Sequence, residues 1–326
     1  MDVAASGLGL TMSNAAGNSA PLTVRRRATL LGAAVPAAFA GLLTCWLLAD
    51  PTGPGLASTA GVVALIAGVA LVGLGCLPLL GAQPSLAAIA GFALVWLVAD
   101  VIVTWFDVAS RAGIPVASVR VGQFVDGVTS SPGEVISGVV AMAIIGWALL
   151  ARRTAEPVIP VTVVGALAGL GIVAPAVTGH AATHTMEPIL VVAHVLCAAW
   201  WCGSLAAMAM TVTSRNGWRT VLPAFSRHAP IAVGILTVTG LASGAIELGF
   251  DADWWTTGYG QVMLAKTLGL AALIGLGAWH RRHWVPEVMA RRGTVERSLR
   301  SAVVEVALMC VVLGLAAGLA STSPLG

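Results

Sequence analysis

Long apolar runs separated by short polar breaks extend along the chain from about residue 29 to its end. Nine runs have the length that a helix needs to cross a bilayer, about 20 residues for about 30 Å of hydrocarbon. They cover residues 29–49, 57–80, 86–106, 134–151, 158–178, 188–212, 229–248, 261–280 and 300–321. The pattern predicts an all-α, polytopic transmembrane helix bundle of about nine helices.

Proline and glycine punctuate the breaks, as at residues 50–55, 83–85 and 131–133, and mark turns. The connection from 107 to 132 is longer, and we expect a partly ordered loop on the outer surface. Residues 1–24, rich in Ser, Gly and Asn, are expected to form a disordered cytoplasmic tail. The first apolar run is longer than the apolar part of a signal peptide, so we expect an uncleaved first helix.

Positive charges are distributed unevenly between alternate connections. With Arg25, Arg26 and Arg27 in the cytoplasm, the inner connections hold 14 arginines and the outer ones only Arg111 and Arg120. Cytoplasmic connections of membrane proteins are enriched in Lys and Arg. The count therefore places the N-terminus in the cytoplasm and the C-terminus on the periplasmic or extracellular side.

The composition supports the same class of protein. The chain is 58% hydrophobic and 10% charged, whereas soluble domains average about 45–50% and about 25%. This excludes a soluble enzyme and a nucleic-acid-binding domain. The sequence has neither a nucleophile–base arrangement nor a phosphate-binding glycine loop, so we expect neither an enzyme nor direct use of ATP.

One outer connection carries side chains that suit copper. His180, His184 and Met186 lie between the runs 158–178 and 188–212, with Glu187 beside them. Imidazole and thioether groups both bind copper, and thioethers favour Cu(I). We expect a metal site in this loop; the alternative is that the two histidines are solvated loop residues.

His194 follows about two turns inside the next run, roughly 10 Å below the outer surface. Cys197, Trp201 and Met208 continue the same stripe of that helix. In one interpretation the stripe is a ladder of soft ligands along a copper path, with Cys197 as a second ligand beside His194. In the other it is a packing seam, and His194 is a hydrogen-bonded core histidine.

Three ionisable groups, Asp100, Lys266 and Glu305, lie inside apolar runs. Charges inside hydrocarbon are costly and usually face the bundle interior or water. Lys266 is expected at the depth of His194, where it would anchor a carboxylate such as Asp100 or repel a straying cation. Glu305 is expected roughly 10 Å deeper. The alternative for all three is snorkelling to the nearest interface.

The remaining histidines, His228, His280 and His283, fall near predicted cytoplasmic helix ends among several arginines. We expect them to contact helix ends or lipid headgroups. A copper exit site is the alternative.

The run from His194 to Leu205 resembles a pattern of the CopD copper-resistance family, in which a His is followed after six residues by Trp, one residue and Gly-Gly-Leu. Ser204 stands in place of the second Gly, and Cys197 and Cys202 in place of small or aliphatic residues. The resemblance covers roughly residues 175–324. Its other matching features are Gly179-His180-Ala181, Tyr259-Gly260 with Lys266, Arg300 to Glu305, and Ser323-Pro324.

This resemblance implies a multi-pass protein of the bacterial inner membrane. It implies that copper ions are the transported substrate and move inward from the periplasmic side, with a soluble periplasmic copper carrier as partner besides the lipid bilayer. It also implies a CopD-like domain of five transmembrane helices over residues 158–326, preceded by a four-helix membrane region over residues 25–157.

Two other functions stay open. The chain is similar to the CopD-like half of actinobacterial CopD/CtaG fusion proteins, so one alternative is an assembly factor that delivers copper to a cytochrome oxidase. Its partner would then be an oxidase assembly component. The other alternative is a di-haem b-type transmembrane cytochrome. Such a protein needs histidines that face each other across helices, whereas His194 is the only histidine well inside an apolar run.

Overall fold

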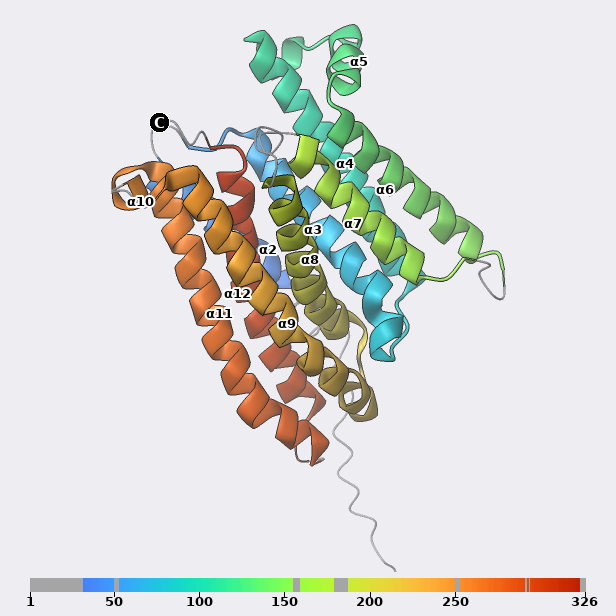
Figure 1. Cartoon of the computed structure of the whole chain (residues 1–326). Coiled ribbons are helices and arrows are strands. Elements are labelled where there is room, and N and C mark those ends of the chain that lie inside the picture. The colour runs from blue at the N-terminus through green and yellow to red at the C-terminus, as the bar shows by residue number, and fades with distance from the viewer. Residues whose placement is uncertain are drawn as a thin grey trace, which may run out of the picture.

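The computed structural model describes residues 32–49, 53–154, 159–178, 187–249, 253–290, 292 and 294–322. Every regular element in these residues is a helix, and nine of the helices, 15 to 34 residues long, form one bundle (Figure 1). The elements are α2 (Ala34–Leu48), α3 (Ala57–Cys76), η1 (Leu77–Leu80), α4 (Leu86–Ala112), η2 (Val116–Ser118), α5 (Val121–Thr129), α6 (Pro132–Ala151), α7 (Thr162–Thr178), α8 (Glu187–Thr211), α9 (Arg215–Leu248), α10 (Asp253–Thr256), α11 (Gly258–Met289) and α12 (Val295–Leu319).

The bundle presents an apolar surface. Large apolar side chains are exposed on its long helices, including Leu47 (73% exposed), Val238 (67%) and Leu268 (70%). Apolar surface of this extent is unfavourable in water and suits lipid. Seven of the described helices are long and apolar enough to cross a membrane, and α2 and α7 are shorter apolar helices. The chain is therefore an all-α polytopic membrane protein, while the total of nine spans and the orientation stay predictions.

Helices on the predicted cytoplasmic side extend beyond the apolar runs. α9 begins at Arg215, well before the run 229–248, because the Oγ of Ser214 caps it by accepting a hydrogen bond from the Gly217 amide at 3.0 Å. α11 continues past residue 280 to Met289. Apolar length marks the membrane part of a helix, and capping decides where the helix ends.

Helix α3 is central to the bundle. It packs against α4 and α7 on one side and against α8 and α12 on the other (Figure 1). A Cβ added to Gly73 would overlap the backbone carbonyl of Gly203 on α8, and one added to Gly75 would overlap the backbone of Gly165 on α7. Small residues at such crossings let helix backbones approach closely. α3 thereby fixes the position of α8, which carries His194.

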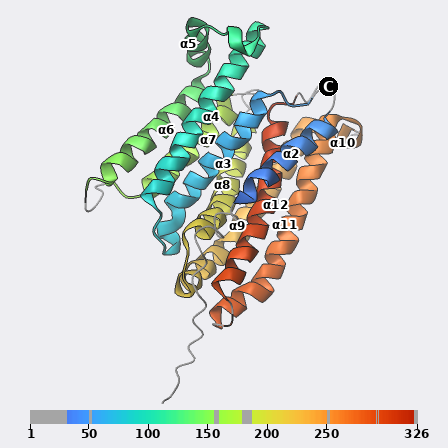
Figure 2. The same cartoon turned by 180° about the vertical axis from the view of Figure 1, so that it is seen from behind.

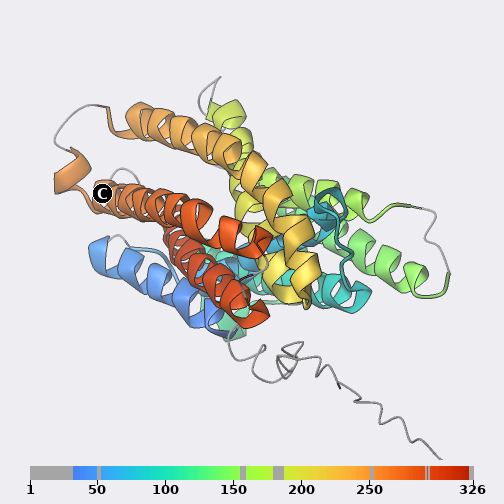
Figure 3. The same ribbon diagram turned by 90° about the horizontal axis from the view of Figure 1, so that it is seen from below.

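The first and last described helices, α2 and α12, lie side by side (Figures 2 and 3). A Cβ on Gly41 would overlap the carbonyl of Val311, and one on Gly314 would overlap the carbonyl of Ala38. Helices from the predicted regions 25–157 and 158–326 therefore pack directly on each other. The boundary between the two regions stays a prediction.

The long connection after α4 is largely helical. α4 continues to Ala112, and Gly113 follows it with a positive φ of 63°. The indole of Trp105 then contacts the ring of Phe124 on α5, with ring centroids 5.1 Å apart. α5 lies at the same end of the bundle as α10 and the C-terminal end of α12, which is the predicted outer side (Figure 1).

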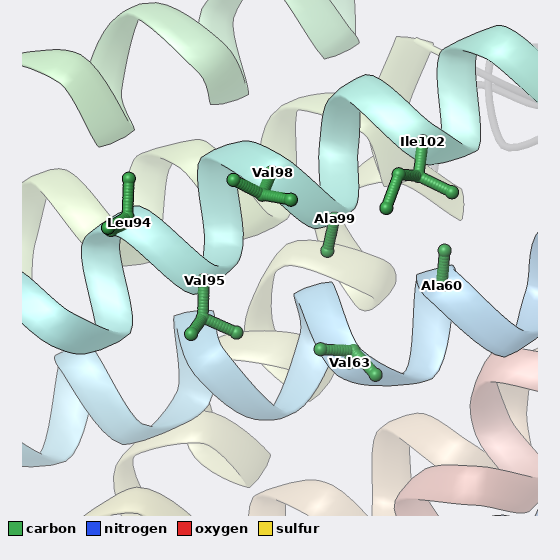
Figure 4. A pocket seen from close by; sticks show the side chains of 7 residues that line it. All are labelled: Ala60, Val63, Leu94, Val95, Val98, Ala99 and Ile102. Atoms are coloured by element: carbon green, nitrogen blue, oxygen red, sulfur yellow. The ribbon is translucent and has the colours of Figure 1, made fainter.

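An apolar groove lies between α3 and α4 (Figure 4). Only hydrocarbon side chains line it, so it offers a metal ion no ligand. Its lining includes Ala60 and Val63 of α3 and Leu94, Val95, Val98 and Ile102 of α4. The polar chemistry lies instead where α8, α9, α11 and α12 meet.

Candidate functional site

His194 lies on α8, and its side chain contacts α9. The residue is half-buried, seven residues after the start of α8, or about 10 Å along the helix. Its Nδ1 lies 3.1 Å from Oγ1 of Thr239 on α9. The neighbouring Gly240 makes room for the ring, since a Cβ there would lie only 3.1 Å from Cε1 of His194.

The hydrogen bonds of Thr239 decide which nitrogen of His194 carries the proton. The Thr239 hydroxyl has one proton, and it donates this proton to the backbone carbonyl of Ile235 at 2.8 Å, with Leu236 O at 3.2 Å. Its oxygen therefore accepts a hydrogen bond from Nδ1–H of His194. In the neutral imidazole this leaves Nε2 with a free lone pair, which is the form that binds a metal ion.

The other predicted ligands near His194 differ in position. His180, His184 and Met186 lie outside the described residues. Cys197 is a half-buried free thiol one turn along α8. Over the parts of the chain that the structure describes, no group of three or more His, Cys, Asp or Glu side chains is placed to hold a metal ion.

The inner part of the α8 stripe is packed into the core. Trp201 is 4% exposed and Met208 is fully buried, and both belong to the main hydrophobic cluster of the bundle. At the outer end of α8, Glu187 is 6% exposed, and its Oε2 has no hydrogen-bond partner in the described part of the chain. The stripe therefore has a polar outer end and a tightly packed inner end.

Lys266 lies on α11, half-buried, and is close enough to His194 to interact with it electrostatically. It also interacts with the thiol of Cys45 on α2. A positive charge near His194 opposes both protonation of the imidazole and binding of a second cation.

Asp100 lies on α4, on the other side of the bundle from Lys266. Its Oδ2 accepts a hydrogen bond from Ser137 Oγ at 2.5 Å, which joins α4 to α6. Lys266 lies on α11, away from this pair of helices (Figure 1). The expectation that Lys266 anchors Asp100 is therefore wrong, because helix packing separates residues that the sequence placed only by depth.

Glu305 and His280 form a buried pair between α12 and α11. Oε2 of Glu305 lies 2.7 Å from Nδ1 of His280, and the two residues are 4% and 5% exposed. The expectation that His280 contacts a helix end or lipid headgroups is therefore wrong. His228 and His283 are exposed, and each Nδ1 bonds to the carbonyl four residues earlier on its own helix.

A signal for this pair exists in the sequence. α11 and α12 are antiparallel neighbours joined by a short connection centred near residue 292. His280 lies 12 residues before that centre (292 − 280) and Glu305 lies 13 after it (305 − 292). In two antiparallel helices, residues at equal distances from the connection lie at the same height in the bundle. The spacing therefore predicts that His280 and Glu305 are neighbours.

Fold and side chains together define a multi-pass helical membrane protein with buried or half-buried acidic and basic groups on α4, α8, α11 and α12. Residues 219–319 match the profile of the family described as Copper resistance protein D, CopD. This segment contains Thr239, Lys266, His280 and Glu305, whereas His194 precedes it. Through this segment the chain is similar to the CopD copper-resistance family.

The chain is also similar to the Copper transport protein CutJ of Bacillus subtilis (strain 168). The two are 29% identical over 140 residues, which are 40% of this chain and 25% of that protein. The match thus spans about a quarter of the relative's length. No solved structure matches the chain. Family and relative together support a copper-related function in a membrane.

Proposed function

We propose that the protein carries copper ions across the cytoplasmic membrane, inward from the periplasmic side, and that His194 is the first ligand inside the membrane. The observation that carries this proposal is the 3.1 Å contact between Nδ1 of His194 and Oγ1 of Thr239, which favours a proton on Nδ1 and leaves Nε2 to bind a metal ion. The similarity to the CopD family and to CutJ, a copper transport protein, supports copper as the ion.

Further copper ligands would come from residues that precede and follow His194 in the sequence. His180, His184 and Met186 precede α8 on the predicted outer loop, and the buried carboxyl of Glu187 adds an acceptor for a cation there. Cys197 offers a thiol on the inner side. Imidazole, thioether and thiol groups are the soft ligands that favour copper over Mg²⁺ or Ca²⁺.

Lys266 would keep the site from holding copper too tightly. Its ammonium interacts electrostatically with His194. A copper ion bound to His194 would therefore be repelled by Lys266 while it is held by its ligands. A transported ion must bind well enough to enter and weakly enough to leave. Copper is cargo in this proposal and no covalent bond of a substrate is changed, so the protein is a transporter rather than an enzyme. A soluble periplasmic copper carrier would supply the ion.

Copper uptake into proteoliposomes of known orientation tests the proposal. The purified chain should move copper inward faster than empty vesicles do, and it should not move Mg²⁺ or Ca²⁺. Vesicles that bind copper without taking it up would contradict transport and favour delivery of copper to an oxidase. A Soret absorption band in the purified protein would instead indicate a haem protein.

A further inference from the structure

We propose that His280 and Glu305 form a proton-binding site in the inner half of the bundle, where a proton leaves as a copper ion arrives. The inference deepens the proposed function and rests on it. The proposed copper ligands are on α8 and the loop before it, whereas this pair lies on α11 and α12. By releasing a proton, the pair would compensate the positive charge that a copper ion brings into the bundle.

Glu305 is paired with a histidine rather than with an arginine. Of the ion pairs found in the described residues, the one that includes this buried carboxylate joins it to a histidine. Arg281 and Arg282 follow His280 directly but are exposed. Arginine keeps its charge at every physiological pH and would fix the pair permanently. Histidine exists in a neutral and a charged form, so this pair can hold a proton or release it.

The surroundings of the pair hold the imidazole in place. Trp279 and Trp284 flank His280 with ring centroids 5.3 Å away, and Nε1 of Trp284 donates to Ser298 Oγ at 3.2 Å. Gly277 of α11 lies next to Glu305, since a Cβ added there would be 3.9 Å from Oε1. The positions of the two side chains are thus fixed by packing, whereas the proton between them can leave.

Among the described residues, two thiols are the other titratable groups that interact with this pair or with each other nearby. The thiols of Cys202 and Cys310 lie within electrostatic range of each other, and Cys202 also interacts with Glu305. α9 brings Trp218 against Trp284, with Arg219 next to it in sequence. Arg281 and Arg282 on α11 are exposed, and Lys266 on the same helix is placed by its electrostatic interactions with His194 and Cys45.

Charge balance links this pair to copper. With one shared proton, imidazolium and carboxylate sum to zero. A Cu(I) ion that approaches through the low-dielectric interior raises the local charge to plus one, which is costly. Release of the proton from the imidazolium to the cytoplasmic side restores neutrality. After copper has left, a proton from the periplasmic side reloads the pair. One copper ion and one proton therefore enter in each cycle, and neither side chain needs to be a copper ligand.

The route of the ion brings it under the influence of this pair. Cys202 lies on α8, eight residues after His194 and about 12 Å further along the helix. Because Cys202 interacts electrostatically with Glu305, an ion that moves inward along α8 comes within range of the carboxylate. The same helix therefore connects the outer copper ligand with the inner proton site.

Proteoliposomes with a pH-sensitive dye inside test the inference. Wild-type protein should acidify the lumen as copper enters, and uptake should fall toward tenfold per pH unit as the lumen is made more acidic, the limit for one competing proton. The double variant His280→Gln with Glu305→Gln keeps a hydrogen-bonded pair without a titratable group. It should carry copper without the pH signal and lose the dependence on luminal pH. Asp100→Asn, which changes a carboxyl on α4, should behave as wild type.

The outcomes separate the two proposals. Wild-type protein that carries no copper overturns the proposed function and this inference together. Copper uptake without a pH signal overturns the inference alone. A double variant that keeps the pH signal also overturns it, and so does a folded double variant that moves neither ion, because the pair would then be needed for passage itself. Gel filtration and thermal unfolding in detergent establish that the variant is folded.

Discussion

The hydroxyl oxygen of Thr239 on α9 lies 3.1 Å from Nδ1 of His194 on α8, and the hydroxyl donates its own hydrogen bond to the carbonyl of Ile235. A residue of the matched CopD segment thereby orients a histidine that lies outside that segment. Partners of this kind fix the tautomer and direction of metal-binding histidines. The relationship makes α8 and α9 one functional unit.

Removal of the Thr239 hydroxyl should weaken copper binding. Thr239→Val keeps the shape of the side chain but frees Nδ1, so both tautomers of His194 become populated. We expect about 10–100-fold weaker copper binding, as found when partners of metal-binding histidines are removed. Titration of purified protein with Cu(I) against a competing chelator measures this. Thr237→Val is the matched control, because the hydroxyl of Thr237 donates to the Val233 carbonyl of its own helix, and the substitution should leave binding unchanged. Equal affinities for both variants would contradict the role of Thr239.

Neutralising Lys266 should tighten copper binding. Lys266→Met removes the positive charge that acts on His194 while it keeps the length of the side chain. We expect a few-fold higher affinity for copper together with slower release, since repulsion of the bound cation is lost. Lys266→Arg keeps the charge and should resemble wild type. Binding and uptake that are unchanged in Lys266→Met would instead favour simple snorkelling of the lysine.

The close crossing of α3 and α8 should be essential for stability. In Gly73→Ala the new methyl group would overlap the carbonyl of Gly203, so the helices must separate. We expect a loss of about 1–3 kcal/mol in the free energy of unfolding, typical of overpacking. Gly61→Ala on the same helix meets nothing within 4 Å and serves as the control. Thermal unfolding in detergent compares the two, and similar melting temperatures would contradict the packing at this crossing.

The orientation of the bundle can be tested by thiol labelling. Val121 on α5 is 74% exposed at one end of the bundle, and Arg282 is exposed near the other end (Figure 1). Val121→Cys should react with an impermeant thiol reagent applied from the periplasmic side, whereas Arg282→Cys should react only after the membrane is opened. The five native cysteines are buried or half-buried, so the unsubstituted chain gives the background. The opposite labelling pattern would reverse the topology and the direction of transport.

The long helices could be predicted because apolar length is a local property. Each of the nine runs corresponds to a helix among the described residues, although α9 begins earlier than its run because Ser214 caps a polar extension. The copper ligands on the loop before α8 stay predictions, since His180, His184 and Met186 lie outside the described residues.

Partners between helices could not be predicted in the same way. Thr239 gives no signal in the sequence, because a threonine in an apolar helix usually bonds to its own backbone. Asp100 was one partner suggested for Lys266, with repulsion of a cation as the other role, yet the bundle separates the two residues. His280 was expected at a surface because arginines follow it, but those arginines are exposed on a helix that turns His280 inward toward Glu305.

Copper uptake by His194→Ala tests the central claim most directly. The variant is compared in oriented proteoliposomes with wild type and with His228→Ala, which removes an exposed histidine from α9. All three proteins are adjusted to equal amounts of folded protein. The account predicts that His194→Ala binds and transports almost no copper while His228→Ala matches wild type. Wild-type uptake by folded His194→Ala would contradict the account.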